Sequence, residues 1–307
     1  MCILGLDTSN YTTSAALVRD GEILCDQRIQ LQIPPGKKGL RQSDALFQHW
    51  KNIPYVLREP LKGYGDRIRA VCVSSTPRPV AGSYMPVFGA GVSSANILSD
   101  ALRVPLYETS HQEGHFKAGA VGTTIDFGQP LIAAHLSGGT LEFILIRDSC
   151  YERVGGTKDI SYGQLFDRTG VLLGLDFPAG QALDELALSG IDNEEKNPLG
   201  PVFRLGAWLN LSGTEQQVKQ LIGRYETEKI SVSLFRRIGE SLVSVLDHLR
   251  ADLNVDQVLI TGGVAGSRSL RSYCRSKGYQ FGEPSLCGDN AVGVALLKGQ
   301  PIWQSNR

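Results

Sequence analysis

Short apolar segments followed by polar turns open both halves of the chain. Residues 2–7 are an apolar run that ends at Asp7, and residues 8–14 after it are rich in hydroxyl groups. Residues 131–136 and 141–146 are apolar runs on either side of a small-residue turn. Runs of this length predict β-strands, and a return across a tight turn predicts a hairpin. Two such units predict a duplicated architecture rather than two unrelated domains.

Apolar residues that recur every three or four positions predict helices between these strands. The clearest pattern covers residues 231–253, with apolar side chains at Leu234, Ile238, Leu242, Val245, Leu246 and Leu249. Alternation of such helices with short strands predicts a two-lobed α/β protein. Further helices are expected at 42–58, 91–102, 164–173 and 181–188, with a last one from about 289–290. Further strands are expected at 15–24, 70–74 and 257–260, and loops at 76–82 and 191–213.

Composition limits the class of protein. The 307 residues carry no net charge and are 42 % hydrophobic and 20 % charged, as in an ordinary folded chain of about two domains at ~150 residues each. Zero net charge argues against binding nucleic acid by bulk charge alone, although a local patch remains open. Six scattered cysteines without a C-x-x-C pair exclude a cysteine-rich zinc module. With no signal peptide and no apolar span of about 20 residues, we expect a cytoplasmic protein without a membrane segment.

Two histidines form the most chemical cluster. His111 and His115 are four residues apart, so on a helix both rings can reach one cation. Glu113 stands two residues after the first histidine, whereas a zincin requires it directly after. No P-C-x-x-C follows, which excludes a nucleobase deaminase. Two partly exposed helical histidines are the equally open alternative, and a metal site would need a third ligand, which we expect to be a carboxylate.

Glycine-rich turns form the second candidate site. Residues 137–140 and 262–267 each follow a predicted strand, and glycines let backbone N–H groups approach a phosphate closely. One such turn alone is more simply an ordinary tight turn. Together with the hydroxyl-rich turn of residues 8–14, three small-residue turns follow three predicted strands, a pattern typical of the actin, Hsp70 and sugar-kinase class. Two single aspartates have simple structural readings from the sequence alone. Asp167 can pair with Arg168 or cap a turn, and Asp289 can cap a helix.

Taken together, these segments resemble the tRNA threonylcarbamoyladenosine transferase family (TsaD/Gcp, formerly classed as a glycoprotease or peptidase M22). The matching segments occur in the family's order over nearly the whole chain. They are Ile3–Ser9, His111–His115, Leu136–Thr140, Phe166–Thr169, Leu172–Pro178, Gly262–Ala265 with Arg268–Arg271, and Asp289-Asn290.

The resemblance implies an actin-like ATPase (ASKHA) fold with two similar lobes and a nucleotide and metal cleft between them. The lobes would be residues 1–108 and 109–307, with the C-terminal helix packing back on the first lobe. One zinc or iron ion would be held by His111, His115 and Asp289, whereas the resemblance leaves the catalytic residue unassigned. The ribose would face Asp167, Gly180 and Asp184, and phosphates or adenine would face Ser137, Gly138, Gly139, Gly262, Gly263 and Ser267.

The implied reaction moves a threonylcarbamoyl group from its adenylate onto adenosine in tRNA, with metal assistance. The implied partners are this donor, tRNA, and a protein partner or a second subunit. The family's first loop usually reads E-T-S-C-D-E-T, whereas residues 7–13 here have Asn10 in place of the cysteine, and Tyr11 and Thr12 in place of the two acidic residues after it. Residues 75–79 replace the family's A-G-P-G loop and include Arg78, and the expected H-S-Q segment has given way to residues 32–44 with Lys37 and Lys38. These departures leave a non-catalytic nucleotide-binding, dimerisation or scaffold paralogue as the alternative.

Overall fold

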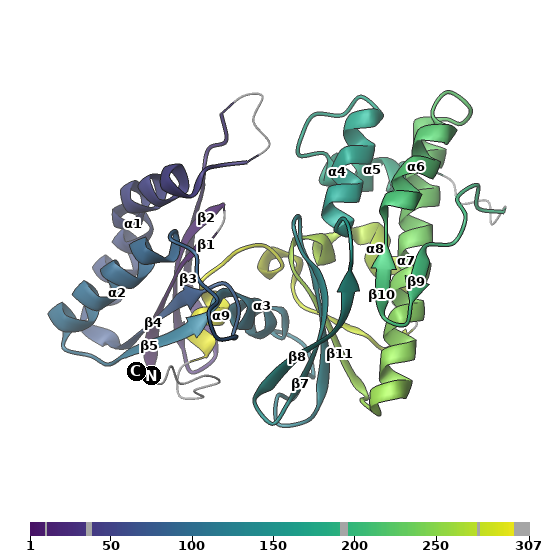
Figure 1. Cartoon of the computed structure of the whole chain (residues 1–307). Helices are drawn as coiled ribbons and strands as arrows, with labels where there is room; N and C mark the ends of the chain where they lie inside the picture. Colours follow the sequence, from purple (N-terminus) through teal and green to yellow (C-terminus); the bar gives the residue numbers. More distant parts are fainter. Residues whose placement is uncertain (10, 35–38, 191–195, 275–276, 298–307) are drawn as a thin grey trace. The chain divides into compact units, whose positions relative to one another are not determined.

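The computed structural model of the chain (Figure 1) is described for residues 1–9, 11–34, 39–190, 196–274 and 277–297. Unit 1 comprises residues 1–121 and the segment from 288 onward, and unit 2 comprises residues 122–287. This division differs from the expected boundary after residue 108, because helix α3 (His111–Gly119) packs against α9 (Val292–Leu296) and the first sheet. Within the described residues, every helix is too short or too polar to cross a membrane.

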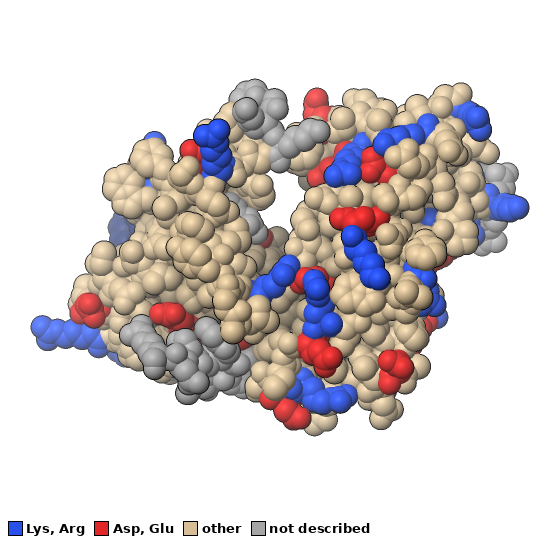
Figure 2. All heavy atoms as spheres, viewed as in Figure 1, with Lys and Arg blue, Asp and Glu red and all other residues tan. Residues whose placement is uncertain are grey.

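Charged side chains of both signs are interspersed over the face drawn in Figure 2. This mixture agrees with the balance of 31 basic and 31 acidic residues in the sequence. No large field of one sign covers that face, so any contact with an anionic partner there depends on individual side chains.

Unit 1 is built on a five-stranded sheet in the order β3-β2-β1-β4-β5. Strands β1 to β3 form an antiparallel meander, whereas β4 and β5 run parallel to β1. The carboxyl ends of three parallel strands therefore meet at one edge, where α/β folds place their ligand sites. The strands are β1 (Cys2–Ser9), β2 (Thr12–Arg19), β3 (Glu22–Gln30), β4 (Ile68–Thr76) and β5 (Leu106–Ser110).

Helices cover both faces of this sheet. Side chains alternate along β1, and Leu4 and Leu6 pack in one cluster with α1 (Gln42–Tyr64) and α2 (Phe88–Leu102). Gly5 faces the opposite way, where an added Cβ would lie 2.4 Å from the backbone oxygen of Ala291 beside α9. Asp7 follows Gly5 by two residues and therefore shares the face that α3 and α9 cover.

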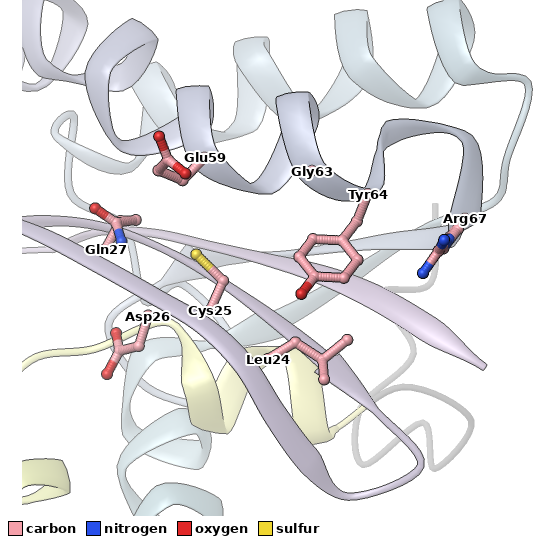
Figure 3. Close-up of a pocket in the computed structure, with 8 residues that line it drawn as sticks. All are labelled: Leu24, Cys25, Asp26, Gln27, Glu59, Gly63, Tyr64 and Arg67. Atoms are coloured by element: carbon pink, nitrogen blue, oxygen red, sulfur yellow. The ribbon is translucent and has the colours of Figure 1, made fainter.

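A cavity of about 700 Å³ lies in unit 1 between β3 and the C-terminal part of α1 (Figure 3). Burial raises the pKa of the Cys25 thiol in its wall, so the thiolate that nucleophilic or metal chemistry needs is scarce at neutral pH. No predicted site residue is among the eight that line it. These are Leu24, Cys25, Asp26, Gln27, Glu59, Gly63, Tyr64 and Arg67.

Unit 2 repeats the topology of unit 1 within a sheet of order β12-β11-β6-β7-β8-β10-β9. Strands β6 to β8 form an antiparallel meander, and β11 and β12 run parallel to β6. The duplicated architecture predicted from the paired hairpins is therefore confirmed. The strands are β6 (Leu131–Leu136), β7 (Leu141–Arg147), β8 (Cys150–Thr157), β9 (Phe203–Leu205), β10 (Trp208–Asn210), β11 (Gln257–Thr261) and β12 (Gln280–Phe281).

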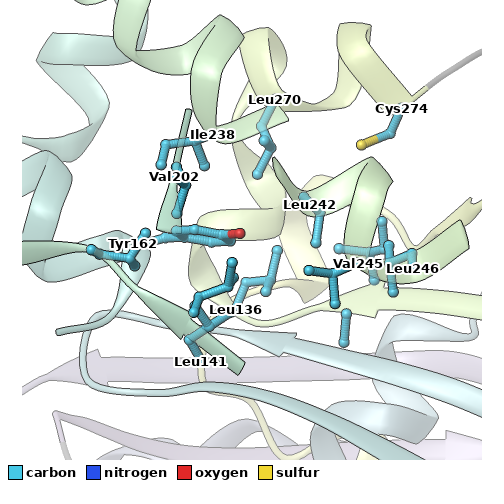
Figure 4. Close-up of a cluster of buried hydrophobic side chains, with 14 of the residues drawn as sticks. Leu136, Leu141, Tyr162, Val202, Ile238, Leu242, Val245, Leu246, Leu270 and Cys274 are labelled. Carbon is cyan, nitrogen blue, oxygen red and sulfur yellow. The ribbon is translucent and has the colours of Figure 1, made fainter. Parts of the chain in front are cut away.

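Helix α7 (Thr227–Leu253) supplies much of the core of unit 2. Its side chains Ile238, Leu242 and Val245 lie near Leu136 and Leu141 at the β6–β7 turn (Figure 4). All six apolar positions that predicted this helix are buried. The other helices of unit 2 are α4 (Tyr162–Leu172), α5 (Gly180–Ser189), α6 (Ser212–Leu221) and α8 (Arg268–Cys274).

The prediction that residues 191–213 form a loop is wrong in its second half. Strands β9 and β10 extend the sheet there, and α6 begins at Ser212. Three-residue strands are too short for a period to show, and all of β9 is exposed. Strand β8 was also not predicted, because only Gly155 and Gly156 of its eight residues are buried, so it shows no apolar period.

Candidate metal centre and nucleotide-binding residues

A capped helix sets the position of the two histidines. Glu113 N donates to Ser110 Oγ at 3.2 Å, and Ser110 N donates to Glu113 Oε2 at 2.8 Å. This capping box fixes the start of α3, so His111 and His115 lie on one face. Both histidines are buried, which excludes the alternative of partly exposed surface residues. Glu113 is directed to the helix start, as its spacing from the histidines indicated.

Asp289 meets the histidines from the segment before α9. The Nε2 atoms of His111 and His115 are 3.0 Å apart. Oδ1 of Asp289 lies 3.5 Å from Nε2 of His111 and 3.3 Å from Nε2 of His115. All three residues belong to unit 1, because α9 packs against α3. The three side chains form a compact group of the kind that holds a metal ion.

Asp7 lies behind His111, and sequence reasoning assigned it no role. His111 Nδ1 donates to Asp7 Oδ1 at 3.1 Å, while the hydroxyls of Ser74 and Ser9 donate to the two carboxylate oxygens. The bond keeps a proton on Nδ1 and leaves Nε2 to face His115 and Asp289. The available signal was an acidic residue in an otherwise apolar strand at the edge of the sheet.

The pKa shifts follow from this arrangement. Burial alone lowers the pKa of His111, but the charges and hydrogen bonds of Asp7 and Asp289 raise it to about 10. Burial and the charge on His111 together lower the pKa of His115. Burial alone raises the pKa of Asp289, but bonds from both histidines hold it well below its ordinary value. The group thus pairs two carboxylates with one imidazolium, and a divalent cation in place of that proton would neutralise it.

The donor set fits a zinc or iron ion. Such an ion takes imidazole nitrogen and carboxylate oxygen at about 2.0–2.2 Å, which places neighbouring ligand atoms about 3–3.5 Å apart. The three separations between Nε2, Nε2 and Oδ1 are 3.0, 3.3 and 3.5 Å. Three protein ligands leave a position for substrate, as in catalytic rather than structural sites.

The remaining histidines lie elsewhere in the fold. His49 belongs to α1, and its Nδ1 is 2.9 Å from Thr13 Oγ1. Burial lowers the pKa of His49 to about 4, so its ring is neutral at physiological pH. His135 and His248 lie on β6 and α7 of unit 2. None of them is part of the metal-ligand group of unit 1.

In unit 2 the first predicted phosphate turn joins β6 to β7. Ser137 N donates to Thr140 O at 2.8 Å, and Thr140 N donates to Ser137 Oγ at 3.0 Å. A Cβ added to Gly138 or Gly139 would meet no atom within 4 Å, so the backbone of both glycines is open to approach. Ser161 Oγ donates to Gly138 O at 2.7 Å and fixes the turn to the start of α4.

The second glycine turn follows β11, which runs parallel to β6. Gly262 has φ +92°, and an added Cβ would lie 2.4 Å from the backbone oxygen of Leu136. This glycine is therefore required by close packing of the two turns, as in an ordinary tight turn. Gly263 begins a short 3₁₀ turn, and a Cβ there would meet no atom within 4 Å. Its N–H is therefore the better candidate for contact with an anion.

Asp167 caps a helix with one of its two carboxylate oxygens. Its Oδ1 accepts the N–H groups of Ala179 and Gly180 at 2.9 Å each, at the start of α5. Among the described residues no donor bonds Oδ2. Burial raises the pKa of Asp167, against the effect of these two bonds. Arg168 pairs with Glu215 at 3.1 Å rather than with Asp167.

Asp184 holds the start of α8. Its Oδ1 accepts from Ser267 Oγ at 2.8 Å and from Ser269 N at 3.1 Å, while Oδ2 accepts from Arg268 N at 2.8 Å. Both oxygens thus fix the end of the second glycine turn. Contact of Asp184 with a ribose stays a prediction, as does the contact of Gly180 and Ser267 with a nucleotide.

The altered loops are described only in part. Tyr11 is 44 % exposed after β1, and Asn10 lies outside the described residues. Lys37 and Lys38 also lie outside them. Arg78 is exposed on the loop between β4 and α2.

Solved structures define the class of fold. Full-length HypF in its phosphate- and nucleotide-bound form matches with a TM-score of 0.63 and 14 % sequence identity. This match covers 99 % of this chain and 56 % of HypF. A ROK family glucokinase from Streptomyces griseus, in complex with glucose and AMPPNP, matches with a TM-score of 0.55 and 12 % sequence identity. This match covers 97 % of this chain and 99 % of the glucokinase. At such low sequence identity these matches show the fold alone. It is the actin-like ATPase (ASKHA) fold that was predicted from the sequence.

Sequence comparison then defines the family. The model of the family described as "TsaD: tRNA N6-adenosine threonylcarbamoyltransferase" matches residues 27–296. A relative of that name from Caldicellulosiruptor saccharolyticus is 32 % identical over 98 % of this chain and 94 % of its own length. A relative of the same name from Bacillus subtilis is 29 % identical over 96 % of this chain and 89 % of its own length. The chain belongs to the TsaD family of transferases.

Proposed function

We propose that this chain transfers a threonylcarbamoyl group from its adenylate to the exocyclic amine of an adenosine in tRNA. In this step a C–N bond forms to the carbamoyl carbon and the C–O bond to phosphate breaks. AMP leaves, and the amine gives up one proton. The observation that carries the proposal is the convergence of His111, His115 and Asp289, with Asp7 bonded behind them, in a member of this family.

One zinc or iron ion would be held by Nε2 of His111, Nε2 of His115 and a carboxylate oxygen of Asp289. When bound, such an ion polarises a carbonyl oxygen as a Lewis acid. The hydrogen bond to Asp7 keeps the proton of the neutral His111 ring on Nδ1. The ring therefore presents its lone pair at Nε2. Burial of His111, His115 and Asp7 limits competition from water at these contacts, whereas the Asp289 side chain stays 21 % exposed.

The residues of unit 2 would bind the nucleotide part of the donor. The accessible backbone of Gly138, Gly139 and Gly263 favours contact with phosphate oxygens. Oδ2 of Asp167 would accept a hydrogen bond from a ribose hydroxyl, a role supported by the use of only Oδ1 at the start of α5. Asp184 would act indirectly by holding Ser267 and the second glycine turn.

A protein partner, or a second copy of the chain, would bind at α1. Phe47 and Trp50 are 58 % and 66 % exposed, and their rings stack with centroids 6.1 Å apart. Exposed aromatic side chains on a helix are typical of protein interfaces. Light scattering would detect a dimer, and W50E should dissociate it whereas K62E, at the other end of α1, should not. We place the protein in the cytoplasm, where tRNA acceptors occur.

The test is a direct transfer assay. Purified protein is incubated with the threonylcarbamoyl adenylate and unmodified tRNA, and mass spectrometry looks for N6-threonylcarbamoyladenosine. Product in the wild type and its loss in H111A supports the proposal. No product from metal-replete protein, together with no binding of ATP or AMP by calorimetry, would instead favour a scaffold paralogue. The replacement of the family's loop acids by Tyr11 and Thr12 is the observation behind that second candidate.

A further inference from the structure

The loop between β4 and α2, residues 77–87, is fixed at both ends to the metal-ligand group. At its start, Gln112 N donates to Pro77 O at 3.1 Å, within the first turn of α3. At its end, the Phe88 ring lies 6.3 Å from the ring of His111, centroid to centroid. Thr8, the neighbour of Asp7, donates from Oγ1 to Val87 O at 3.1 Å. Both ends of this loop are therefore anchored next to His111 and Asp7.

Hydrogen bonds within the loop hold it in one shape. Arg78 N donates to Ser83 Oγ at 3.0 Å, and Ser83 N donates to Val80 O at 3.1 Å. Val80 N donates to Arg78 O at 2.9 Å, and Gly82 at φ +77° allows the tight return. The prolines Pro77, Pro79 and Pro86 restrict the backbone further. A ligand would thus meet preorganised side chains rather than a loop that it must order.

The side chains that this loop exposes are of the type that binds unpaired nucleotides. Tyr84 is 75 % exposed, more than any other large apolar side chain in the described part of the chain. Val80 is 49 % exposed, and Arg78 is also exposed. An aromatic ring stacks on a base that has left its helix, and an arginine beside it binds phosphate. With charges of both signs interspersed on the face in Figure 2, such local contacts would have to supply the recognition.

We propose that the loop of residues 77–87 binds the acceptor RNA, with Tyr84 stacking on an unpaired base next to the reacting adenosine and Arg78 contacting a phosphate. The proposal rests on the proposed function and names the residues that would position its acceptor. Tyr84 and Arg78 are positioning residues here, since they act on nucleotides around the reacting amine. A protein ligand for Tyr84 is the competing outcome.

Direct RNA binding tests this proposal without the transfer reaction. Fluorescence anisotropy would measure binding of a hairpin RNA with adenosines in a single-stranded loop, and of the same sequence fully paired. We expect the wild type to prefer the unpaired loop. Y84A should weaken that binding about 5- to 100-fold, Y84F should restore it, and R78A should weaken it and lower its salt dependence by about one charge. The matched control is Y55A, which removes another exposed tyrosine of unit 1 from α1.

Steady-state kinetics separates this role from a structural one. Y84A should raise KM for tRNA by about the same factor while kcat, metal content and nucleotide binding stay near those of the wild type. Equal binding by Y84A and Y55A, or a wild type that binds neither RNA, would overturn the loop proposal. If the wild type binds RNA but makes no product, the proposed function fails, and the binding of Y84A still decides the loop.

Discussion

Units 1 and 2 share one strand topology but place different chemistry at the same edge of the sheet. In unit 1, Asp7 near the end of β1, Ser74 in β4 and His111 after β5 form a network of ionisable and hydroxyl side chains. In unit 2, the ends of β6 and β11 lead into glycine turns whose backbone is the available group. The topology decides where a site forms, whereas the residues at the strand ends decide what it binds.

The glycine turns also differ from each other. Gly262 is needed because the backbone of Leu136 passes too close for any Cβ, whereas Gly138, Gly139 and Gly263 have open space around them. In unit 1 the corresponding loop after β4 carries exposed Arg78 and Tyr84. The same topological position thus serves backbone packing in one unit and side-chain display in the other.

The largest expected effect comes from removing the carboxylate of the metal-ligand group. D289A should lower the rate of threonylcarbamoyl transfer by about 100-fold or more, because stabilisation of several kcal/mol is lost with the ion. D252A removes an exposed carboxylate from α7 of unit 2 and should leave the rate unchanged. Single-turnover kinetics with bound donor makes the measurement. A rate for D289A within a few-fold of the wild type would show that the ionisable site of unit 1 is not the reaction centre.

The second effect is on the pH dependence of metal affinity. Burial alone lowers the pKa of His111, but Asp7 and Asp289 raise it to about 10, so below that pH the ion must displace a proton. Affinity should therefore fall about tenfold for each pH unit, or about 100-fold from pH 8.5 to 6.5. Competition with a chelating dye measures it.

D7N sharpens this test, because it removes the charge behind His111 while keeping the size of the side chain. We expect the affinity to fall about 10- to 100-fold. The pH dependence should also become shallower, since one of the two groups that raise the pKa of His111 is neutral. An unchanged slope in D7N would contradict the role given to Asp7.

The glycine turn of unit 2 gives a paired prediction of intermediate size. G262A should lower the free energy of unfolding by about 2 kcal/mol or more, because φ is +92° and the Cβ meets Leu136 O. G263A should change it by less than about 0.5 kcal/mol but weaken AMP binding. Thermal unfolding and calorimetry separate the two effects. Wild-type AMP affinity in G263A would remove this turn from the nucleotide site.

The smallest effect is expected at Glu113. E113A should cost about 1 kcal/mol of stability through the lost capping box, and E113Q should cost less, since glutamine can also close that box. The transfer rate of E113Q should stay within about twofold of the wild type, whereas loss of a general base would cost about 100-fold or more. Such a loss in E113Q would mean that the residue does more than start α3.

Much of this fold could be predicted because its strands and α7 have clear periods. The hairpins of residues 131–136 with 141–146 and the buried stripe of α7 follow directly from apolar spacing. Strand β9 escaped prediction because it has three exposed residues, and β8 because only its two glycines are buried. Hydrophobic periodicity does not predict a strand that is stabilised mainly by pairing with its neighbouring strands.

The metal-ligand group was predictable only in part. The four-residue spacing of His111 and His115 is a local signal, whereas Asp289 comes from the other end of the chain and was implied only by the resemblance. The role of Asp7 depends on three parallel strands that bring Ser74 and His111 to its carboxylate. Such a convergence is set by tertiary structure and leaves no spacing in the sequence.

Metal content shows whether His111, His115 and Asp289 hold an ion. Protein purified without chelator, reconstituted with zinc or iron and dialysed, is analysed by mass spectrometry of the elements. We predict about one ion per chain in the wild type and near none in H111A, with H49A as the histidine control from the opposite face of the sheet. A wild type that retains no ion, or an H111A variant that retains as much as the wild type, would contradict the account.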